Sequence, residues 1–311
     1  MQILPKLPGG GNGLSIASWN ATALIALDDV KAKTRLTCLR NLVCRHDVVG
    51  IQEVHGTTAQ QQQYLGTFGA SHCVGCSGAA NPAAGGVSLL VSTRLGVRKP
   101  VFTPLVAGRA IAATICDEDE SISVFICLHN FGLLPAEKDV IIDFICDARS
   151  KCQSAGGGNG MVTLLGDFNF TAEGDFATTY GDGGGAKHVE QVRDRSTWSR
   201  ALKPMVEFFQ PEPTRTQWRE QDGRKSVITT RIDRIYSSMP SWLAVQLSIS
   251  GATVVPSTQS WAKVASDHTP LSIRISVVPP VSTSARPVPM WIARHPRYAE
   301  TLPQILLPGG P

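Results

Sequence analysis

Polar and ionisable side chains stand at the ends of short apolar stretches along this chain of 311 residues. Each stretch is rich in residues that favour a buried β-strand. A carboxylate at the edge of a hydrophobic core is costly to desolvate without a partner, and catalytic groups tend to collect at strand ends, where a rigid sheet positions them. The residues are Asn20, Gln52, Glu53, His129, Asn130, Asp167, Asn169, Asp233, Asp267 and His268.

These residue types could together hydrolyse a phosphodiester. That reaction needs charge neutralisation on the phosphoryl oxygens, an activated water and help for the leaving oxygen. Carboxylate and amide oxygens are hard ligands that suit Mg²⁺. A histidine whose tautomer is fixed by a carboxylate can donate or accept a proton.

Each residue taken singly also has a structural explanation. A G-D-x-N sequence, here 166–169, is usually a turn in which the Asp and Asn side chains bond their own backbone. Glu53 could form a salt bridge at a strand edge, and Asp233 could pair on the surface with a flanking arginine. A lone histidine is more often a hydrogen-bonded structural residue. Only the joint occurrence of these residues favours a functional site.

The chain alternates β-rich runs with helical stretches. The runs predicted as strands are short, rich in Val, Ile, Ser and Thr, and bounded by Gly or Pro. Pro135 near the first turn favours one helix, whereas Pro204 weakens another. The predicted strands are 14–20, 47–54, 85–92, 110–116, 121–130, 160–169, 231–238, 245–255 and 270–277, and the predicted helices are 31–46, 135–152 and 197–209.

Strands on both sides of each helix predict an α/β fold in which two sheets pack face to face with helices outside. Residues 1–13 are expected to be a flexible lead, and 14–278 a single folded domain. Repeated prolines in 279–311 predict a tail or linker outside the core.

Composition narrows the setting of the protein. A hydrophobic content of 42% and a charged content of 17% favour a folded domain over disorder, and the net charge of +4 is weak evidence about partners. The eight cysteines lack zinc-finger spacing, so a reducing compartment is favoured over a metal at Cys73 and Cys76. Without a secretory signal or a long apolar run, we expect an intracellular, soluble protein in either nucleus or cytoplasm.

In chain order, the motifs W-N, Q-E-V-H, L-H-N, G-D-F-N, R-I-D-R-I-Y and S-D-H resemble the endonuclease/exonuclease/phosphatase superfamily. Its members include abasic-site endonucleases, pancreatic deoxyribonuclease, sphingomyelinases and inositol-polyphosphate phosphatases. The resemblance extends from Leu14 to Val277. It implies the deoxyribonuclease-like four-layered sandwich, in which two mixed β-sheets are flanked by helices.

The same resemblance implies a metal site. Glu53 corresponds to the principal ligand, Asn20 to a residue that orients the metal or the phosphate, and Asp267 to a second, water-mediated ligand. The expected ion is Mg²⁺, with Mn²⁺ as the alternative.

Catalytic roles follow from the resemblance as well. Asp167 would position or deprotonate the attacking water, and Asn169 would hold the scissile phosphate. Asp233 resembles the carboxylate partner of His268. His129 matches the members that carry a histidine at this strand end, which suggests a second acid on the leaving-group side. Thr22 replaces an aspartate of the abasic-site enzymes, which puts abasic-site specificity in doubt.

DNA is the expected substrate. The segment 187–234 carries eleven Lys and Arg against seven Asp and Glu, with Trp198 and Trp218 interleaved, and a basic surface with aromatic residues can follow a phosphate backbone. The tail sequence PVPMWIARHPRYAE is similar to the junction after the endonuclease domains of LINE-type retrotransposons. Predicted substrate contacts are Asn130, Arg231 and Arg234.

Two other functions stay open. The same chemistry would serve a phosphatase or phosphodiesterase acting on a lipid or inositol phosphate. A catalytically inactive module that binds nucleic acid is also compatible with the fold, although the chemically competent residues argue against it. No feature of the sequence indicates an obligate protein partner or a membrane.

Overall fold

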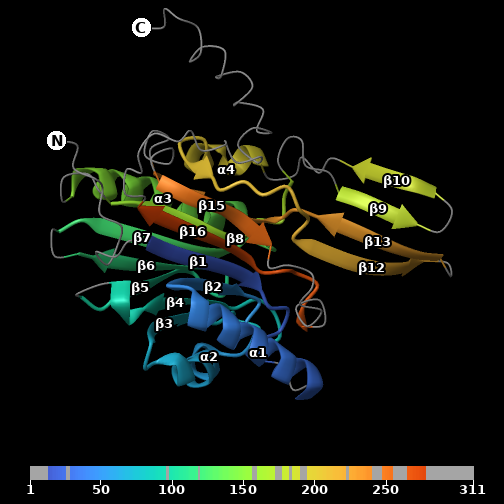
Figure 1. Cartoon of the computed structure of the whole chain (residues 1–311), viewed down its shortest axis with the longest axis horizontal. Helices are drawn as coiled ribbons and strands as arrows, with labels where there is room; N and C mark the ends of the chain where they lie inside the picture. The colour runs from blue at the N-terminus through green and yellow to red at the C-terminus, as the bar shows by residue number, and fades with distance from the viewer. Residues whose placement is uncertain are drawn as a thin grey trace, which may run out of the picture.

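The structure is a computed structural model of the chain, coloured from N- to C-terminus in Figure 1. The structure describes 13–25, 29–95, 98–117, 120–155, 160–171, 177–181, 184–189, 195–221, 224–239, 247–254 and 265–277. The predicted lead, apart from Gly13, which begins the first strand, lies outside the described residues, as does the Pro-rich tail with its likeness to a LINE junction.

The first of two large sheets contains the strands nearest the N-terminus together with the last two. Its order is β15-β16-β1-β2-β4-β3. β1 and β2 run parallel, and β16 pairs antiparallel with the other side of β1. The bounds are β1 (Gly13–Asn20), β2 (Val48–Gln52), β3 (His72–Ser77), β4 (Val87–Ser92), β15 (Leu247–Val254) and β16 (Leu271–Val277).

The second large sheet is built from the middle of the chain in the order β11-β14-β8-β7-β6-β5. Its parallel pair is β7 and β8, and β14 runs antiparallel to β8. The bounds are β5 (Val101–Val106), β6 (Ala110–Cys116), β7 (Ile122–His129), β8 (Val162–Asp167), β11 (Val206–Glu207) and β14 (Asp233–Ser237).

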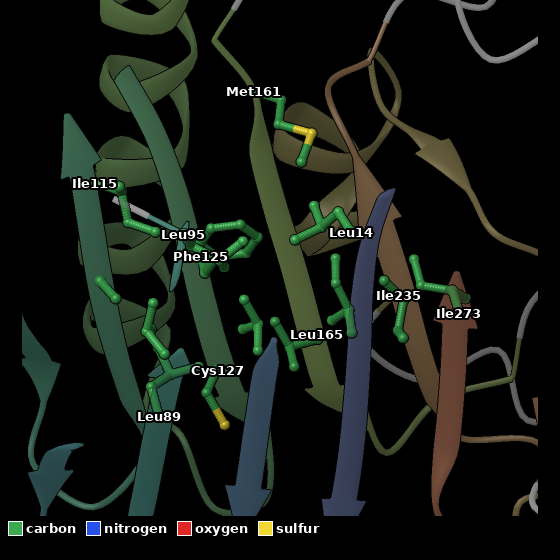
Figure 2. Packing of buried hydrophobic residues seen from close by; sticks show 14 of the residues in the cluster. Leu14, Leu89, Leu95, Ile115, Phe125, Cys127, Met161, Leu165, Ile235 and Ile273 are labelled. Carbon is green, nitrogen blue, oxygen red and sulfur yellow. The ribbon is translucent and has the colours of Figure 1, made fainter. Parts of the chain in front are cut away.

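Side chains from the inner faces of both sheets form the central core. Figure 2 shows Leu14, Leu89, Phe125 and Leu165 reaching into this layer from strands of the two sheets. The sheets approach so closely at Gly50 that a Cβ there would lie 2.5 Å from Leu165 Cδ1. Burial of apolar surface on this scale is the main stabilising contribution to the fold.

Helices cover the outer faces. Leu39, Leu42 and Val43 of α1 belong to a core that packs on the first sheet. Ile141 and Ile145 of α3 belong to a core on the second sheet. Figure 1 shows α1 and α2 on the opposite side of the sheets from α3 and α4. The bounds are α1 (Asp29–Arg45), α2 (Thr58–Leu65), α3 (Pro135–Ser154) and α4 (Arg195–Leu202), with 3-10 turns Gly66–Phe68 and Thr93–Leu95.

A third, smaller sheet extends from the sandwich in the order β10-β9-β13-β12 (Figure 1). Its strands are β9 (Ala177–Gly181), β10 (Gly184–Val189), β12 (Arg215–Gln221) and β13 (Arg224–Thr230). An isolated bridge between Arg215 and His268 joins the start of β12 to the loop before β16. The base of the β12–β13 hairpin therefore adjoins that loop.

The predicted α/β fold is confirmed: two mixed sheets pack face to face between helices. The helix predicted at 197–209 is α4, which ends at Leu202, because Pro204 cannot continue a helix and β11 follows. The described cysteines are all free thiols. No helix in the described ranges is long and apolar enough to cross a membrane.

Candidate active site

Strand directions bring the predicted residues to one edge of the sandwich. The parallel pairs β1–β2 and β7–β8 end at that edge. Asn20 is therefore in register with Gln52, and His129 is in register with Asp167. β14 begins where β8 ends, which places Asp233 directly opposite Asp167. The polar residues that end separate apolar strands in the sequence therefore form one polar cluster in the fold.

His268 is fixed by bonds to its side chain and backbone. Its Nδ1 lies 2.9 Å from Asp233 Oδ2, and its backbone N–H donates to Ser266 Oγ at 3.0 Å. The Ser266 hydroxyl donates in turn to the Asn20 carbonyl at 2.7 Å, which ties this loop to the end of β1. Trp19 Nε1 donates to the His268 carbonyl at 3.3 Å.

The surroundings of His268 favour its protonated form. Burial alone would lower the pKa of the ring, but the charge and hydrogen bond of Asp233, with the charges of Asp167 and Asp267, outweigh it and raise the pKa to about 9. This ring can therefore hold a proton beside a phosphate and exchange it with the reacting oxygens.

Asp167 accepts hydrogen bonds at both oxygens. Asn20 Nδ2 donates to Oδ2 at 3.0 Å, and the Asn169 backbone N–H donates to Oδ1 at 2.9 Å. His268 Nε2 is 4.0 Å from Oδ2. Burial and the nearby charge of Asp233 raise the pKa of Asp167, although the histidine charges oppose this. A carboxyl with a raised pKa next to a histidine is suited to positioning or deprotonating a water.

The G-D-x-N segment has both turn geometry and a place in the cluster. Gly166 has φ +150°, and a Cβ there would lie 1.9 Å from the Leu128 carbonyl oxygen, so only glycine fits. Asn169 adopts φ 51°, a region that Asn tolerates better than most residues. The motif therefore forms a turn and also contributes Asp167 to the cluster, so the structural and the functional explanations are compatible.

Glu53 has an unusual backbone at the mouth of the cluster. It adopts φ 50°, which is rare for a residue with a long side chain and is found most often at functional sites. Its carbonyl accepts from Ala23 N at 2.9 Å, which fixes the loop after β1 against the loop after β2. The side chain is 27% exposed, and its Oε1 lies 3.4 Å from His129 Nε2.

The contact between Glu53 and His129 is long, and the buried Nε2 has no partner within hydrogen-bond geometry. Even so, the nearby His129 ring has the largest effect on the pKa of Glu53. It lowers this pKa, whereas burial of the carboxyl would raise it. Glu53 is therefore ionised at neutral pH and partly open to solvent, as a metal ligand must be.

Two donor sets in the cluster could receive a metal ion. Ligand atoms of Asp167, Asp233 and His268 all lie within 4.8 Å of one another, the only such group of three among the described residues. However, Asp233 and His268 already bond each other there. Glu53 offers a carboxylate that is 27% exposed, and Asn20 offers an amide oxygen. An oxygen set without histidine fits Mg²⁺ better.

Asp267 is already occupied at both oxygens. Thr22 Oγ1 donates to its Oδ1 at 2.8 Å, and Arg215 Nε donates to its Oδ2 at 3.0 Å. These bonds and the charge of His268 lower the pKa of Asp267 against the effect of burial. The arrangement suits an indirect, water-mediated role. Thr22, which replaces an aspartate of the abasic-site enzymes, also has a structural role here, because its hydroxyl orients Asp267.

Two predicted substrate contacts do not fit their positions. Arg231 and Arg234 are buried, and both pair with Glu207, at 2.5 and 2.8 Å. Arg234 also lies over the Phe170 ring at 5.4 Å. Guanidinium groups held in this way support the packing around β14 and cannot follow a phosphate backbone at the surface.

The remaining predicted contact is also internal. Asn130 is 3% exposed, and its Nδ2 donates to the Phe168 carbonyl, which links the ends of β7 and β8. Of the two tryptophans in the basic segment, Trp198 is fully buried in a core, so the expectation of an aromatic surface fails there. Trp218 on β12 is 74% exposed.

Sequence reasoning missed Arg109. This residue directly precedes β6, and its Nη1 lies 3.0 Å from His129 Nδ1. The only sequence signal was a charged residue beside the apolar run 110–116, at a strand start rather than a strand end. Thr214 was also missed: its hydroxyl accepts the backbone N–H of Asp233 at 3.0 Å and so holds the start of β14.

Comparison with models of known protein families gives a match over most of the chain. A family model described as the endonuclease/exonuclease/phosphatase family matches residues 17–268. That span begins within β1 and closes at His268, and so includes the whole candidate site. No curated protein matches the chain.

Several solved structures share the fold at low sequence identity. The AP endonuclease LMAP from Leishmania major has a TM-score of 0.62 and 16% identity over 85% of this chain and 88% of that one. TDP2 from C. elegans has a TM-score of 0.53 and 14% identity over 86% and 77%. The human Nocturnin catalytic domain with bound sulfate has a TM-score of 0.52 and 15% identity over 86% and 95%.

Proposed function

This chain belongs to the endonuclease/exonuclease/phosphatase family, and we propose from that premise that it is a Mg²⁺-dependent endonuclease that nicks one strand of DNA. The observation that carries the chemistry is the buried cluster of Asp167, Asp233 and His268 at the strand ends, with the ionised Glu53 at its mouth. The proposed domain boundaries are 14–278.

The proposed metal ligands are Glu53 and Asn20, with Asp267 acting through water. The chemistry that a bound Mg²⁺ or Mn²⁺ supplies is charge neutralisation on the phosphoryl oxygens. The donor set fits this ion because its atoms are carboxylate and amide oxygens, and because Glu53 is anchored by its backbone while its side chain stays open to solvent.

The protein's own residues would handle the proton and the water. Asp167 would orient the attacking water, since burial raises its pKa and its two oxygens, held by the hydrogen bonds that they accept, are fixed in position. His268, held by Asp233, would donate a proton to a phosphoryl or leaving oxygen. Asn169 would contact the scissile phosphate from its turn next to Asp167.

DNA is proposed as substrate on two further grounds. Trp218 presents an exposed aromatic ring on the β12 strand, whose base adjoins the cluster through Arg215 and His268. Exposed aromatic rings near a phosphate site can stack on bases. The structural neighbours include a protein named as an AP endonuclease. An origin in a LINE-type retroelement is a further proposal that rests on the tail sequence alone.

Plasmid nicking tests this function directly. Purified protein should convert supercoiled plasmid to the open circle with Mg²⁺ present, and EDTA should abolish the conversion. Glu53→Ala should be inactive at unchanged stability, whereas Glu212→Ala, at an exposed position outside the proposed site residues, should match the wild type. DNA binding that continues in EDTA with no nicking under any condition would mean an inactive binding module.

A second candidate substrate is a lipid or inositol phosphate. Phe131 and Leu134 lie close after His129 and are 62% and 63% exposed, which suits contact with an apolar group. Phosphate release from phosphoinositide vesicles, alongside plasmid that stays supercoiled, would reverse the order of the two proposals.

A further inference from the structure

The two histidines of the cluster have partners of opposite charge. His268 Nδ1 meets the Asp233 carboxylate at 2.9 Å, whereas His129 Nδ1 meets the Arg109 guanidinium at 3.0 Å. A carboxylate accepts hydrogen bonds and favours a ring with hydrogen on Nδ1. A guanidinium only donates, and it stays protonated in proteins. The two rings are therefore prepared for different tasks.

The donor character of Arg109 decides which His129 nitrogen carries the hydrogen. Because the guanidinium has no acceptor, Nδ1 must offer its lone pair, and the hydrogen of the neutral ring lies on Nε2. That nitrogen is buried, lacks a partner within hydrogen-bond geometry and lies 3.4 Å from Glu53 Oε1. The Nε2–H group therefore points to the mouth of the cluster.

Backbone features hold the guanidinium in place. The backbone N–H of His129 donates to the Arg109 carbonyl at 2.8 Å, so the two residues are linked twice. A Cβ at Gly85 would lie 3.2 Å from Arg109 Nη1, and one at Gly132 would lie 3.5 Å from Nη2. Both glycines have positive φ, 73° and 70°, so the notch around the guanidinium depends on glycine.

Arg109 has no carboxylate partner within the part of the chain that the structure describes. Its guanidinium instead donates a hydrogen bond to the His129 ring. A surface arginine retained for solubility would need neither the glycine notch nor this contact. An arginine retained for packing would be expected to pair with an acid, as Arg234 does with Glu207.

We propose that Arg109 is a positioning residue that holds His129 as the Nε2–H tautomer, so that His129 serves the reaction as a fixed hydrogen-bond donor while His268 exchanges the proton. The catalytic part of this inference rests on the proposed phosphodiesterase function; the tautomer does not. A preorganised donor directed at developing negative charge lowers the barrier without any proton transfer. This role replaces the second acid that the sequence suggested for His129.

Nitrogen NMR on the full chain reads the tautomer without substrate. In ¹⁵N-labelled protein with Mg²⁺ added, the ring signals of His129 are assigned by their loss in His129→Gln. We expect the pattern of a bare Nδ1 and a protonated Nε2 in the wild type and in Arg109→Lys, which keeps a cationic donor. Arg109→Met, of similar length but without a donor, should show a mixture of both tautomers.

Activity on supercoiled plasmid completes the test. Arg109→Met should lower kcat roughly 10²-fold, in the range for loss of one preorganised donor or a wrong tautomer, with little change in KM. Arg109→Lys should recover much of that loss, and a thermal melt should show both variants folded. A wild-type ring with hydrogen on Nδ1, or a tautomer that Arg109→Met leaves unchanged, would overturn the proposal. Inactive wild-type protein with the expected NMR pattern would instead count against the proposed function.

Discussion

Asp233 Oδ2 lies 2.9 Å from His268 Nδ1, and both side chains are almost fully buried at the edge where β8 ends and β14 begins. Asp167 lies opposite Asp233 in the same strand pair, so two carboxylates face one ring. This geometry fixes the orientation of His268 by sheet register, before any ligand binds. The consequences can be measured separately in activity, stability and metal binding.

Asp233→Asn should leave the fold intact and impair catalysis. The amide retains the size of the carboxylate but loses the charge that stabilises a protonated ring, and it can present a donor to Nδ1. We expect kcat for plasmid nicking to fall by roughly 10²- to 10⁴-fold, as when the carboxylate of a catalytic triad is replaced by an amide. Asp143→Asn, which alters only an exposed ion pair with Arg200, is the matched control. Full activity in Asp233→Asn would refute the pairing.

Stability without metal should fall as the pH rises through the titration of His268. The folded state raises the pKa of this ring from 6.5 to about 9. Because the pKa is raised, the stabilisation is fully present below about pH 6.5 and is lost as the pH rises through about 9. Urea unfolding in EDTA from pH 6 to 10 measures this loss. Asp233→Asn should flatten the curve across that window, and an equally steep curve would assign the loss to other groups.

Much of the site could be predicted because its residues interrupt an otherwise regular pattern. Apolar strands can be recognised from their composition, and a polar residue at the end of such a strand is a clear departure from it. Once β1, β2, β7 and β8 are parallel neighbours in pairs, their ends must meet. The prediction of Asn20, Glu53, Asp167, Asp233 and His268 as one cluster rested on the strand positions together with the family resemblance. The structure brings these residues to the same edge.

Other features depend on partners far away in the sequence. From the sequence alone, Arg234 is expected to be a surface cation. In the structure it is buried, and it pairs with Glu207, which lies 27 residues earlier. The strands β12 and β13 are rich in polar residues and lack clean alternation, so composition suggested only a charged segment. α2, with the sequence TAQQQQYL, buries just Gln61 and Leu65 and gives little apolar signal. Tertiary context overrides local pattern in each case.

Metal binding should depend on Glu53. A bound ion stabilises the folded state by mass action, about 2.7 kcal/mol when the free ion is at 100 times its Kd. Mg²⁺ should therefore raise the Tm of the wild type, and Glu53→Gln should lose that rise because it removes the ionised oxygen at the mouth of the cluster. Glu212→Gln should retain it. An undiminished rise in Glu53→Gln would favour the Asp167, Asp233 and His268 group as the metal site.

Arg234→Met should destabilise the fold without a specific effect on DNA. The change removes the ion pair between Arg234 and Glu207 and leaves that between Arg231 and Glu207, and breaking a buried ion pair typically costs about 3–5 kcal/mol. The retained bond from Arg231 should keep the loss near the lower end of that range. Urea unfolding measures the cost. Normal stability with weakened DNA binding would restore Arg234 as a substrate contact.

Trp218→Ala should weaken DNA binding while leaving stability unchanged. The ring is 74% exposed on β12, directly opposite Val227 on β13, so its removal opens no cavity. Stacking of one base on an aromatic ring contributes about 1–3 kcal/mol. Fluorescence anisotropy with a labelled oligonucleotide, in a Glu53→Gln background that prevents cleavage, measures the affinity. Trp218→Phe should retain most of it, because the ring face remains. Equal affinity in Trp218→Ala would exclude this strand from the DNA surface, and lost binding to phosphoinositide vesicles in its place would favour the lipid substrate.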